Sequence, residues 1–251
     1  MIQVTITGAS GKMGTTILKL LDSQNYKYRN LIKAKALLSS KKESELYISD
    51  IHEGVKQSDI TIDFTSASYA LKIIKASALY NKKIIIGTTG FSDADLKEIE
   101  QYAQKIPIFL SPNMSIGIYI LSILAQTATK ALTNGSFDLN ILEYHHRKKL
   151  DSPSGTAISI AKMLSNITGD SIKYNEQRRY DNEIHINSIR AGSIIGKHEI
   201  TMNGAFEKIS LIHEAFDRSI YATGALDAAL FMSTIDKPGI YGMADLLPCL
   251  A

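Results

Sequence analysis

A glycine turn between a strand and a helix, at the start of the chain, restricts the possible folds more than any other feature. Ile2–Thr7 is a short run rich in β-branched residues, and G-A-S-G-K-M-G at residues 8–14 leads from it into a helical pattern over Thr15–Leu21. Glycines in such a turn let the backbone bend tightly, approach a pyrophosphate and pack the helix closely on the strand. The spacing G-x-x-G-x-x-G is a variant of the usual dinucleotide fingerprint. We therefore predict a dinucleotide-binding unit, with a plain βα turn as the alternative.

Strands and helices alternate regularly over the rest of the first half. We predict further strands at Ile32–Leu38, Ser58–Phe64, Lys83–Gly87 and Pro107–Leu110, and helices that end near Asn81 and span Ser92–Gln104. This alternation is typical of a parallel sheet with helices on both faces. We therefore expect an α/β fold with a Rossmann-type doubly wound parallel sheet over residues 1–115.

Polar turns follow several predicted strands at the edge where open parallel sheets bind ligands. Gly87-Thr88-Thr89-Gly90 offers small side chains, backbone donors and two hydroxyls, which suit a nicotinamide amide, and Ser111-Pro112-Asn113-Met114 is another such turn. Together with the glycine turn, these segments predict a cofactor site along one edge.

The end of the second predicted strand bears on the choice of cofactor. An acidic side chain there would favour the free 2′-hydroxyl of NAD. The sequence instead reads Leu38-Ser39-Ser40-Lys41-Lys42, with no carboxylate before Glu43. Hydroxyls and lysines suit a 2′-phosphate, and Lys12 can add charge, so we expect NADPH rather than NADH. The alternative is that these lysines form a solvated loop.

The pattern changes after residue 115. A long apolar helix is predicted at Ile116–Leu132, a strand at Phe137–His146 and a helix from Gly155 to about Ile167. Three further strands, a last helix and a turn region are predicted at residues 184–190, 194–202, 208–213, 222–234 and 237–243. These elements predict an α+β domain with an open, largely antiparallel or mixed sheet. The uncovered face of that sheet is a candidate oligomer interface. We place a dinucleotide-binding domain at 1–115 and 226–251, and a substrate-binding and oligomerisation domain at 116–225.

The segment E-Y-H-H-R-K-K-L-D-S-P-S-G-T-A at residues 143–157 carries most of the candidate chemistry. Ser154 can cap a helix that begins near Gly155, and a helix start with free N–H groups binds anions. Histidines and three consecutive basic residues precede it. This combination predicts a proton donor and a cradle for a small polyanion such as a carboxylate. The alternative is a solvated basic loop before a capped helix.

Composition excludes several other classes. The net charge of +3 does not demand nucleic acid, and the single cysteine, Cys249, excludes a disulfide within the chain. No apolar run reaches membrane-spanning length, Met1 leads directly into a strand without a signal peptide, and no Cys/His spacing suggests zinc. We therefore expect a cytoplasmic protein without a metal.

These motifs together resemble the 4-hydroxy-tetrahydrodipicolinate reductase (dihydrodipicolinate reductase) family along the whole chain. The 143–157 segment, with its E-x-H-H-x-x-K-x-D-x-P-S-G-T-A signature, is highly specific for that family. The other matching motifs are G-A-S-G-K-M-G (8–14), I-D-F-T (62–65), G-T-T-G (87–90), S-P-N-M-S-I-G (111–117), I-R-A-G-S-I-I-G (189–196) and Y-A-T-G-A-L (221–226).

The resemblance implies a homotetrameric reductase of lysine and diaminopimelate biosynthesis, which passes hydride from NAD(P)H to a cyclic dicarboxylate. It implies His145 as the general acid and Lys149 as the second catalytic residue. It implies substrate binding by His146, Gly155 and Thr156. Cofactor binding would fall to Gly8, Ala9, Ser10, Gly11, Lys12, Met13, Ser39, Gly87, Thr88, Thr89, Ser111, Pro112, Asn113 and Met114.

The chain departs from the family pattern at several positions. Met114 stands where the family often has phenylalanine, and Ser39 or Ser40 where an acid that reads the ribose is common. Ser193 and Lys197 replace acidic residues, and Glu214 replaces a basic one. Two other functions remain open from the residues: an aspartate or homoserine dehydrogenase type of Rossmann reductase, and a non-catalytic NADPH-binding protein.

Overall fold

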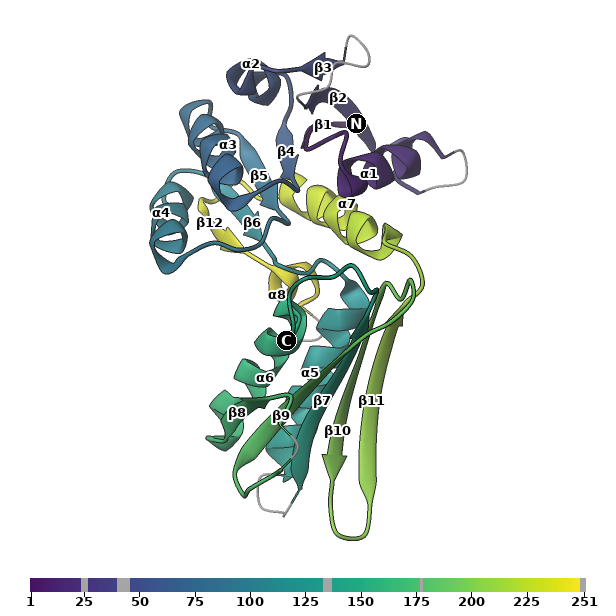
Figure 1. Ribbon diagram of the computed structural model, residues 1–251. Helices are drawn as coiled ribbons and strands as arrows, with labels where there is room; N and C mark the ends of the chain where they lie inside the picture. The colour runs from purple at the N-terminus through teal and green to yellow at the C-terminus, as the bar shows by residue number, and fades with distance from the viewer. Residues whose placement is uncertain (24–26, 40–45, 133–136, 177, 249–251) are drawn as a thin grey trace. The chain divides into compact units, whose positions relative to one another are not determined.

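The chain forms two units, which we describe separately from a computed structural model (Figure 1). The structure describes residues 1–23, 27–39, 46–132, 137–176 and 178–248. The first unit comprises Met1–Ser115 and the carboxyl-terminal residues from Arg218 onward, and the second comprises Ile116–Asp217. The expected second boundary at residue 226 falls inside a helix that belongs wholly to the first unit, so the structure moves that boundary to Arg218.

A seven-stranded sheet forms the centre of the first unit, in the order β12-β6-β5-β4-β1-β2-β3. Every pair of neighbouring strands in it is parallel. The predicted Rossmann-type sheet is therefore confirmed. Its strands are β1 (Ile2–Thr7), β2 (Ile32–Leu38), β3 (Tyr47–Ile48), β4 (Ile60–Asp63), β5 (Lys83–Ile86), β6 (Pro107–Leu110) and β12 (Gly239–Tyr241).

Helices pack on both faces of this sheet, as the side chains of β6 show. Ile108 belongs to an apolar cluster with α3 and α4, whereas the ring of Phe109 contacts that of Phe231 on α7. Successive residues of a strand point to opposite faces, so these helices lie on opposite sides. The helices of the unit are α1 (Lys12–Asp22), α2 (Ile51–Lys56), α3 (Ala67–Leu79), α4 (Asp93–Ala103), α7 (Ser219–Ser233) and α8 (Met243–Leu246).

Sequence patterns missed the shortest elements of this unit. β3 has two residues and α2 has six, too few for a period of two or 3.6 residues to stand out. The region 237–243, predicted as a turn, contains β12 and the start of α8. β12 extends the sheet beside β6, and this long-range pairing leaves no local signal in three residues.

The second unit contains a five-stranded mixed sheet in the order β11-β10-β7-β9-β8. β7 pairs antiparallel with β10 and parallel with β9, so the sheet is mixed, which is one of the two arrangements predicted from the sequence. The helix that separates β7 from β8 and β9 in the chain provides the crossover that parallel pairing requires. The strands are β7 (Asp138–His145), β8 (Ser171–Tyr174), β9 (Glu183–Arg190), β10 (Gly196–Asn203) and β11 (Lys208–Ala215).

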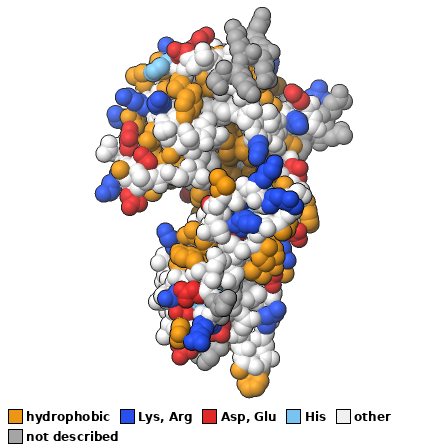
Figure 2. Space-filling model, in the orientation of Figure 1, with side chains coloured by type: hydrophobic (Ala, Val, Ile, Leu, Met, Phe, Trp, Pro, Cys, Tyr) orange, Lys and Arg blue, Asp and Glu red, His pale blue; other side chains and the backbone are white. Residues whose placement is uncertain are grey.

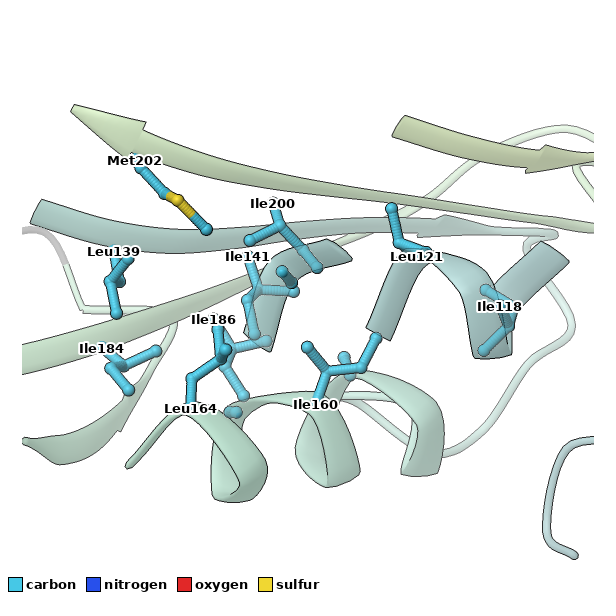
Figure 3. Close-up of a cluster of buried hydrophobic side chains, with 13 residues drawn as sticks. Ile118, Leu121, Leu139, Ile141, Ile160, Leu164, Ile184, Ile186, Ile200 and Met202 are labelled. Carbon is cyan, nitrogen blue, oxygen red and sulfur yellow. The ribbon is translucent and has the colours of Figure 1, made fainter. Parts of the chain in front are cut away.

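Two helices, α5 (Ile116–Leu132) and α6 (Gly155–Thr168), cover one face of the second sheet. Figure 3 shows the apolar core between them, with Ile141 and Ile186 of neighbouring strands pointing toward Ile160 and Leu164 of α6. On β7 this core face also carries Glu143 and His145, because the burial of that strand alternates strictly. The core thus fixes the direction of two side chains from the signature segment.

None of the helices in the described residues has the length and apolar composition needed to cross a membrane.

Candidate functional site

The carboxyl ends of β1 and β4 form the point where the strand order of the first sheet reverses. β2 and β3 lie on one side of β1, whereas β4, which follows them in the chain, lies on the other. Doubly wound sheets bind ligands in the crevice at such a point. Thr7 and Asp63, the last residues of these strands, are register partners, and the glycine turn starts at the next residue, Gly8.

The glycine turn is shaped for the close approach of a ligand. Gly8 has φ +65°, and a Cβ atom there would lie 2.8 Å from the carbonyl oxygen of Phe64. A Cβ at Gly14 would lie 2.5 Å from both the Cα of Ala9 and the oxygen of Gly8. Side chains are therefore excluded at both positions, and α1 begins directly behind the turn at Lys12. A helix start behind a glycine turn fits a pyrophosphate.

Ser39 lies close to this turn. Its hydroxyl is hydrogen bonded to that of Ser10, at 2.7 Å between the oxygens. The structure therefore brings together two predicted cofactor residues that are distant in the sequence. Ser40, Lys41, Lys42 and Glu43, which also entered the prediction of a 2′-phosphate site, lie outside the described residues.

A buried carboxylate, Asp63, connects the loops at this edge. The hydroxyls of Thr7 and Thr65 donate to its Oδ1 atom, and the hydroxyl of Thr88 donates to Oδ2 at 2.5 Å. The N–H of Thr65 donates in turn to the Thr88 hydroxyl at 2.7 Å. Asp63 has no role among those predicted from the sequence, although a carboxylate at the end of a buried strand, within I-D-F-T, is itself a signal.

Asp63 should make stability depend on pH. Burial raises its pKa above 3.8, and hydrogen bonds from Thr7, Thr88 and Thr65 oppose that shift without cancelling it. The Asp63 carboxyl therefore binds its proton more tightly in the folded protein than in the unfolded chain. Its contribution to the free energy of unfolding falls as the pH rises from 3.8 through the raised pKa. We expect Asp63→Asn to remove this slope. Urea titrations of the wild-type protein and of Asp63→Asn at pH 4–7 measure the unfolding free energy at each pH. The same pH dependence in both proteins would contradict the prediction.

The remaining predicted cofactor segments occupy the ends of β5 and β6. Thr88 is buried in the Asp63 network, whereas Thr89 and Gly90 are exposed. The Ser111 hydroxyl donates to the carbonyl of Asn113 at 2.8 Å, which closes a tight turn. Met114 is 1% exposed and packs against Gly224 of α7, so it offers a ligand little side-chain surface.

In the second unit, the end of β7 and the start of α6 bring the signature residues together. Glu143 is fully buried and accepts a hydrogen bond from Nδ1 of His145. Its other oxygen accepts from the backbone N–H of Ser154 at 3.1 Å. The Ser154 hydroxyl caps α6 by accepting from the N–H of Ala157 at 3.2 Å. The predicted cap is therefore present, and one carboxylate connects the histidine to the helix start.

The first turn of α6 is open to a ligand. A Cβ atom added at Gly155 would meet no atom within 4 Å. Gly155 and Thr156 are the first two residues of the helix, and the N–H groups of a first helical turn point out of the helix end. These positions, together with the positive end of the helix dipole, suit a carboxylate.

Lys149 lies in the turn between β7 and α6. Its ammonium group forms an ion pair with Asp151 at 2.9 Å, and its backbone N–H donates to the carbonyl of His146 at 3.0 Å. The Lys149 side chain remains 23% exposed, so it is held in place but accessible.

Arg190 and His198 are two residues of the site that no local sequence pattern predicted. Arg190 of β9 donates to both oxygens of Glu143, at 2.7 and 3.0 Å. The ring of His198 on β10 lies edge-on to that of His145, with centroids 5.4 Å apart. Both are brought to the site by strand pairing, and neither lies in the signature segment. Among the described residues, no group of three or more His, Cys, Asp or Glu side chains could hold a metal ion.

Two family models match the chain over nearly its whole length. The model of the dihydrodipicolinate reductase amino-terminal part matches residues 2–114, and that of the carboxyl-terminal part matches residues 117–247. The chain belongs to the dihydrodipicolinate reductase family.

Individual members of the dihydrodipicolinate reductase family agree with this assignment. The 4-hydroxy-tetrahydrodipicolinate reductase of Rickettsia bellii is 39% identical over 97% of this chain and 94% of its own. The enzyme of that name from Pelagibacter ubique is 36% identical over 98% of each chain. A solved structure of dihydrodipicolinate reductase from Paenisporosarcina sp. TG-14, with dipicolinate bound, has a TM-score of 0.78 at 23% identity and covers 98% of each chain, which supports the fold.

Two of the departures from the dihydrodipicolinate reductase pattern lie opposite each other. Lys197 of β10 and Glu214 of β11 are register partners in the antiparallel pair. The Lys197 ammonium group lies 3.7 Å from Glu199 and over the ring of Tyr144, at 5.0 Å from its centroid. Side chains of opposite charge therefore occupy neighbouring positions of one sheet.

Proposed function

We propose that this chain is an NAD(P)H-dependent reductase that converts 4-hydroxy-tetrahydrodipicolinate to tetrahydrodipicolinate in lysine and diaminopimelate biosynthesis. The observation that carries the proposal is His145, held by a buried carboxylate that also binds the capped start of α6. This geometry supplies a proton donor and an anion site from one short segment. The names of the relatives that match along the chain support the substrate class.

A nicotinamide dinucleotide would supply the hydride when bound. We assign its binding to the residues at the carboxyl edge of the first sheet. The excluded Cβ positions at Gly8 and Gly14 and the helix start behind them fit its pyrophosphate. The residues concerned are Gly8–Met13, Ser39, Gly87–Thr89 and Ser111–Met114.

We assign the remaining chemistry to the second unit. The substrate's hydroxyl leaves as water, which gives a conjugated cyclic imine. Hydride addition to that imine then develops negative charge on the ring, and His145 delivers the proton that neutralises it. Lys149 stabilises that charge and holds a substrate carboxylate. His146 and the N–H groups of Gly155 and Thr156 bind carboxylate oxygens at the helix start. We also assign dinucleotide binding to the first unit and substrate binding to the second.

Ser39 is our candidate for the residue that binds the adenosine ribose and distinguishes its 2′-phosphate from a 2′-hydroxyl. Its hydroxyl bond to Ser10 places it beside the glycine turn, where a carboxylate would repel a 2′-phosphate. We expect Ser39→Asp to weaken NADPH binding more than NADH binding, as measured by fluorescence titration of both cofactors. Ser39→Asn, of similar size without the charge, is the matched control. Equal losses for both cofactors with Ser39→Asp would mean that the 2′-phosphate is not read at Ser39.

We further propose a homotetramer that associates through the second sheet. Leu142, Glu199 and Ile212 are register neighbours on β7, β10 and β11, on the face opposite α5 and α6. Ile212 is 55% exposed, and Figure 2 shows hydrophobic side chains among charged ones on the surface of the molecule. Light scattering after gel filtration tests this state, and a monomer at micromolar concentration would contradict it.

The decisive experiment couples the protein to the preceding synthase, which generates the substrate from pyruvate and aspartate semialdehyde. We expect NADPH oxidation that depends on the synthase, with a slower rate for NADH. Cofactor binding without any oxidation would favour a non-catalytic binding protein. Oxidation of NADPH with aspartate semialdehyde in the absence of the synthase, or reduction of NADP+ by aspartate or homoserine, would favour the other dehydrogenases.

A further inference from the structure

We propose that Glu143 and Arg190 form a positioning pair that keeps His145 in one tautomer, with Nδ1–H toward Glu143, and so makes Nε2 the atom that gives the proton to the substrate. The inference rests on the proposed function, because it describes how the proton donor of that reaction is held. It assigns a role to Arg190, which lies outside the signature segment.

Strand geometry places the two members of the histidine–carboxylate contact. Glu143 and His145 are two residues apart on β7, so both side chains point to the same face of the sheet. Nδ1 of His145 is in hydrogen-bond contact with Oε2 of Glu143. An ionised carboxylate only accepts hydrogen bonds, so Nδ1 must carry a proton whenever this contact exists. In the neutral ring Nε2 then has none, and the proton that converts the ring to an imidazolium sits on Nε2.

Arg190 fixes the carboxylate that fixes the histidine. It is the register partner of His145 on the neighbouring strand β9. Its two terminal nitrogens donate to the two oxygens of Glu143, at 2.7 and 3.0 Å, in a bidentate pair. One of them also donates to the carbonyl oxygen of Asp151 at 2.7 Å. Bidentate pairing restricts the rotation of the carboxylate as well as its position.

The same network reaches the anion site. The N–H of Ser154, the cap residue of α6, donates to Oε1 of Glu143 at 3.1 Å. Arg190 therefore binds the backbone of the turn at Asp151. Glu143 binds it at Ser154, where the turn leads into the helix. A single pair thus fixes both the proton donor and the start of the helix proposed to bind a substrate carboxylate.

The charges around His145 agree with a permanently ionised Glu143. Burial alone would raise the pKa of that carboxyl, but hydrogen bonds from His145 and Arg190 lower it to about 2. His198, from β10, adds no charge at neutral pH, because burial and the neighbouring His145 lower its pKa to about 3. Its Nε2 atom lies 3.3 Å from the hydroxyl of Ser154. The charged groups that act on His198, the ring beside His145, include Glu143 and, from the turn, Lys149. Arg190 binds Glu143 directly.

A second glutamate–histidine pair in the same unit provides a matched control. Glu183 and His185 are also two residues apart on one strand, β9, and their side chains are 2.9 Å apart. Both are nearly buried, at 6% and 5% exposed. This pair carries no proposed role in the reaction, so it separates loss of a buried ion pair from loss of the positioning of His145.

The test compares Glu143→Gln with Glu183→Gln. Because glutamine has nearly the same shape but no charge, we expect Glu143→Gln to lower kcat by up to about 10⁴-fold, the loss that follows when an amide replaces the carboxylate behind a catalytic histidine, with KM changed by less than about 3-fold. Glu183→Gln should keep kcat, and Glu143→Asp should restore part of the activity. Unchanged kcat in Glu143→Gln would overturn the proposal.

Nitrogen-15 NMR of the wild-type protein tests the tautomer without any turnover. With the His145 signals assigned by their absence in His145→Gln, we expect the neutral ring to carry its proton on Nδ1. A proton on Nε2 would overturn the inference even if the enzyme is active. If the wild-type protein oxidises no cofactor with the synthase, the proposed function fails, and the NMR result still decides whether Glu143 fixes the tautomer. The same measurement decides the question if Glu143→Gln does not fold.

Discussion

Replacing His145 with glutamine is expected to lower turnover by roughly 10²–10⁴-fold, the usual contribution of a general acid. Glutamine keeps a polar group at the end of β7 but cannot deliver a proton at neutral pH. Cofactor affinity should change little, because the proposed dinucleotide site lies in the other unit. The measurement is kcat with the synthase-coupled assay, together with a fluorescence titration of NADPH.

A matched variant shows whether the loss is specific. His185→Gln removes another buried histidine that pairs with a glutamate two residues away, and it should keep turnover within about 3-fold. A melting curve of His145→Gln excludes simple unfolding. Turnover that stays near the wild-type value would place the acid elsewhere, and His146 would be the next residue to replace.

Local signals predicted most of the first unit, and the first helix of the second unit, correctly. β1, β2 and β6 have the bounds predicted from their β-branched and apolar runs, and α5 has the bounds of its long apolar pattern. Such elements bury whole faces, so hydrophobic periodicity identifies them. β3 and β12 join the edges of the sheet with two and three residues, and only pairing with distant strands creates them.

The residues of the candidate site also fall into two groups: those that a local sequence pattern predicts and those that only strand pairing brings to the site. His145, Lys149 and the Ser154 cap lie within fifteen residues of signature sequence, and a local pattern revealed them. Glu143 is a charged residue among the apolar core positions of β7, so an apolar pattern does not predict its burial. It can occupy this core position because Arg190 and His145 form hydrogen bonds with its carboxylate. Arg190 and His198 reach the site only through the pairing of β9 and β10 with β7, which no single stretch of sequence specifies.

Gly14→Ala is expected to destabilise the first unit and to weaken dinucleotide binding. The added Cβ would lie 2.5 Å from the Cα of Ala9 and the oxygen of Gly8, and 2.7 Å from the oxygen of Ala9. All three are backbone atoms of the glycine turn, so no rotation of a side chain can relieve the overlap. Alanine is the better helix former by about 1 kcal/mol. Overpacking typically costs about 1–3 kcal/mol, and a rigid backbone contact this short places the cost at the upper end of that range.

The unfolding free energy of Gly14→Ala should therefore fall by about 1–2 kcal/mol, as measured by urea titration. The turn must move to admit the methyl group, so NADPH and NADH affinity should fall together, unlike the selective effect expected for Ser39→Asp. Lys19→Ala, at an exposed position on the same helix, should change stability by less than about 0.5 kcal/mol. A Gly14→Ala protein as stable as the wild type, with unchanged cofactor affinity, would mean that α1 does not need this close contact. The glycine turn would then be the ordinary βα connection that its sequence spacing alone leaves open.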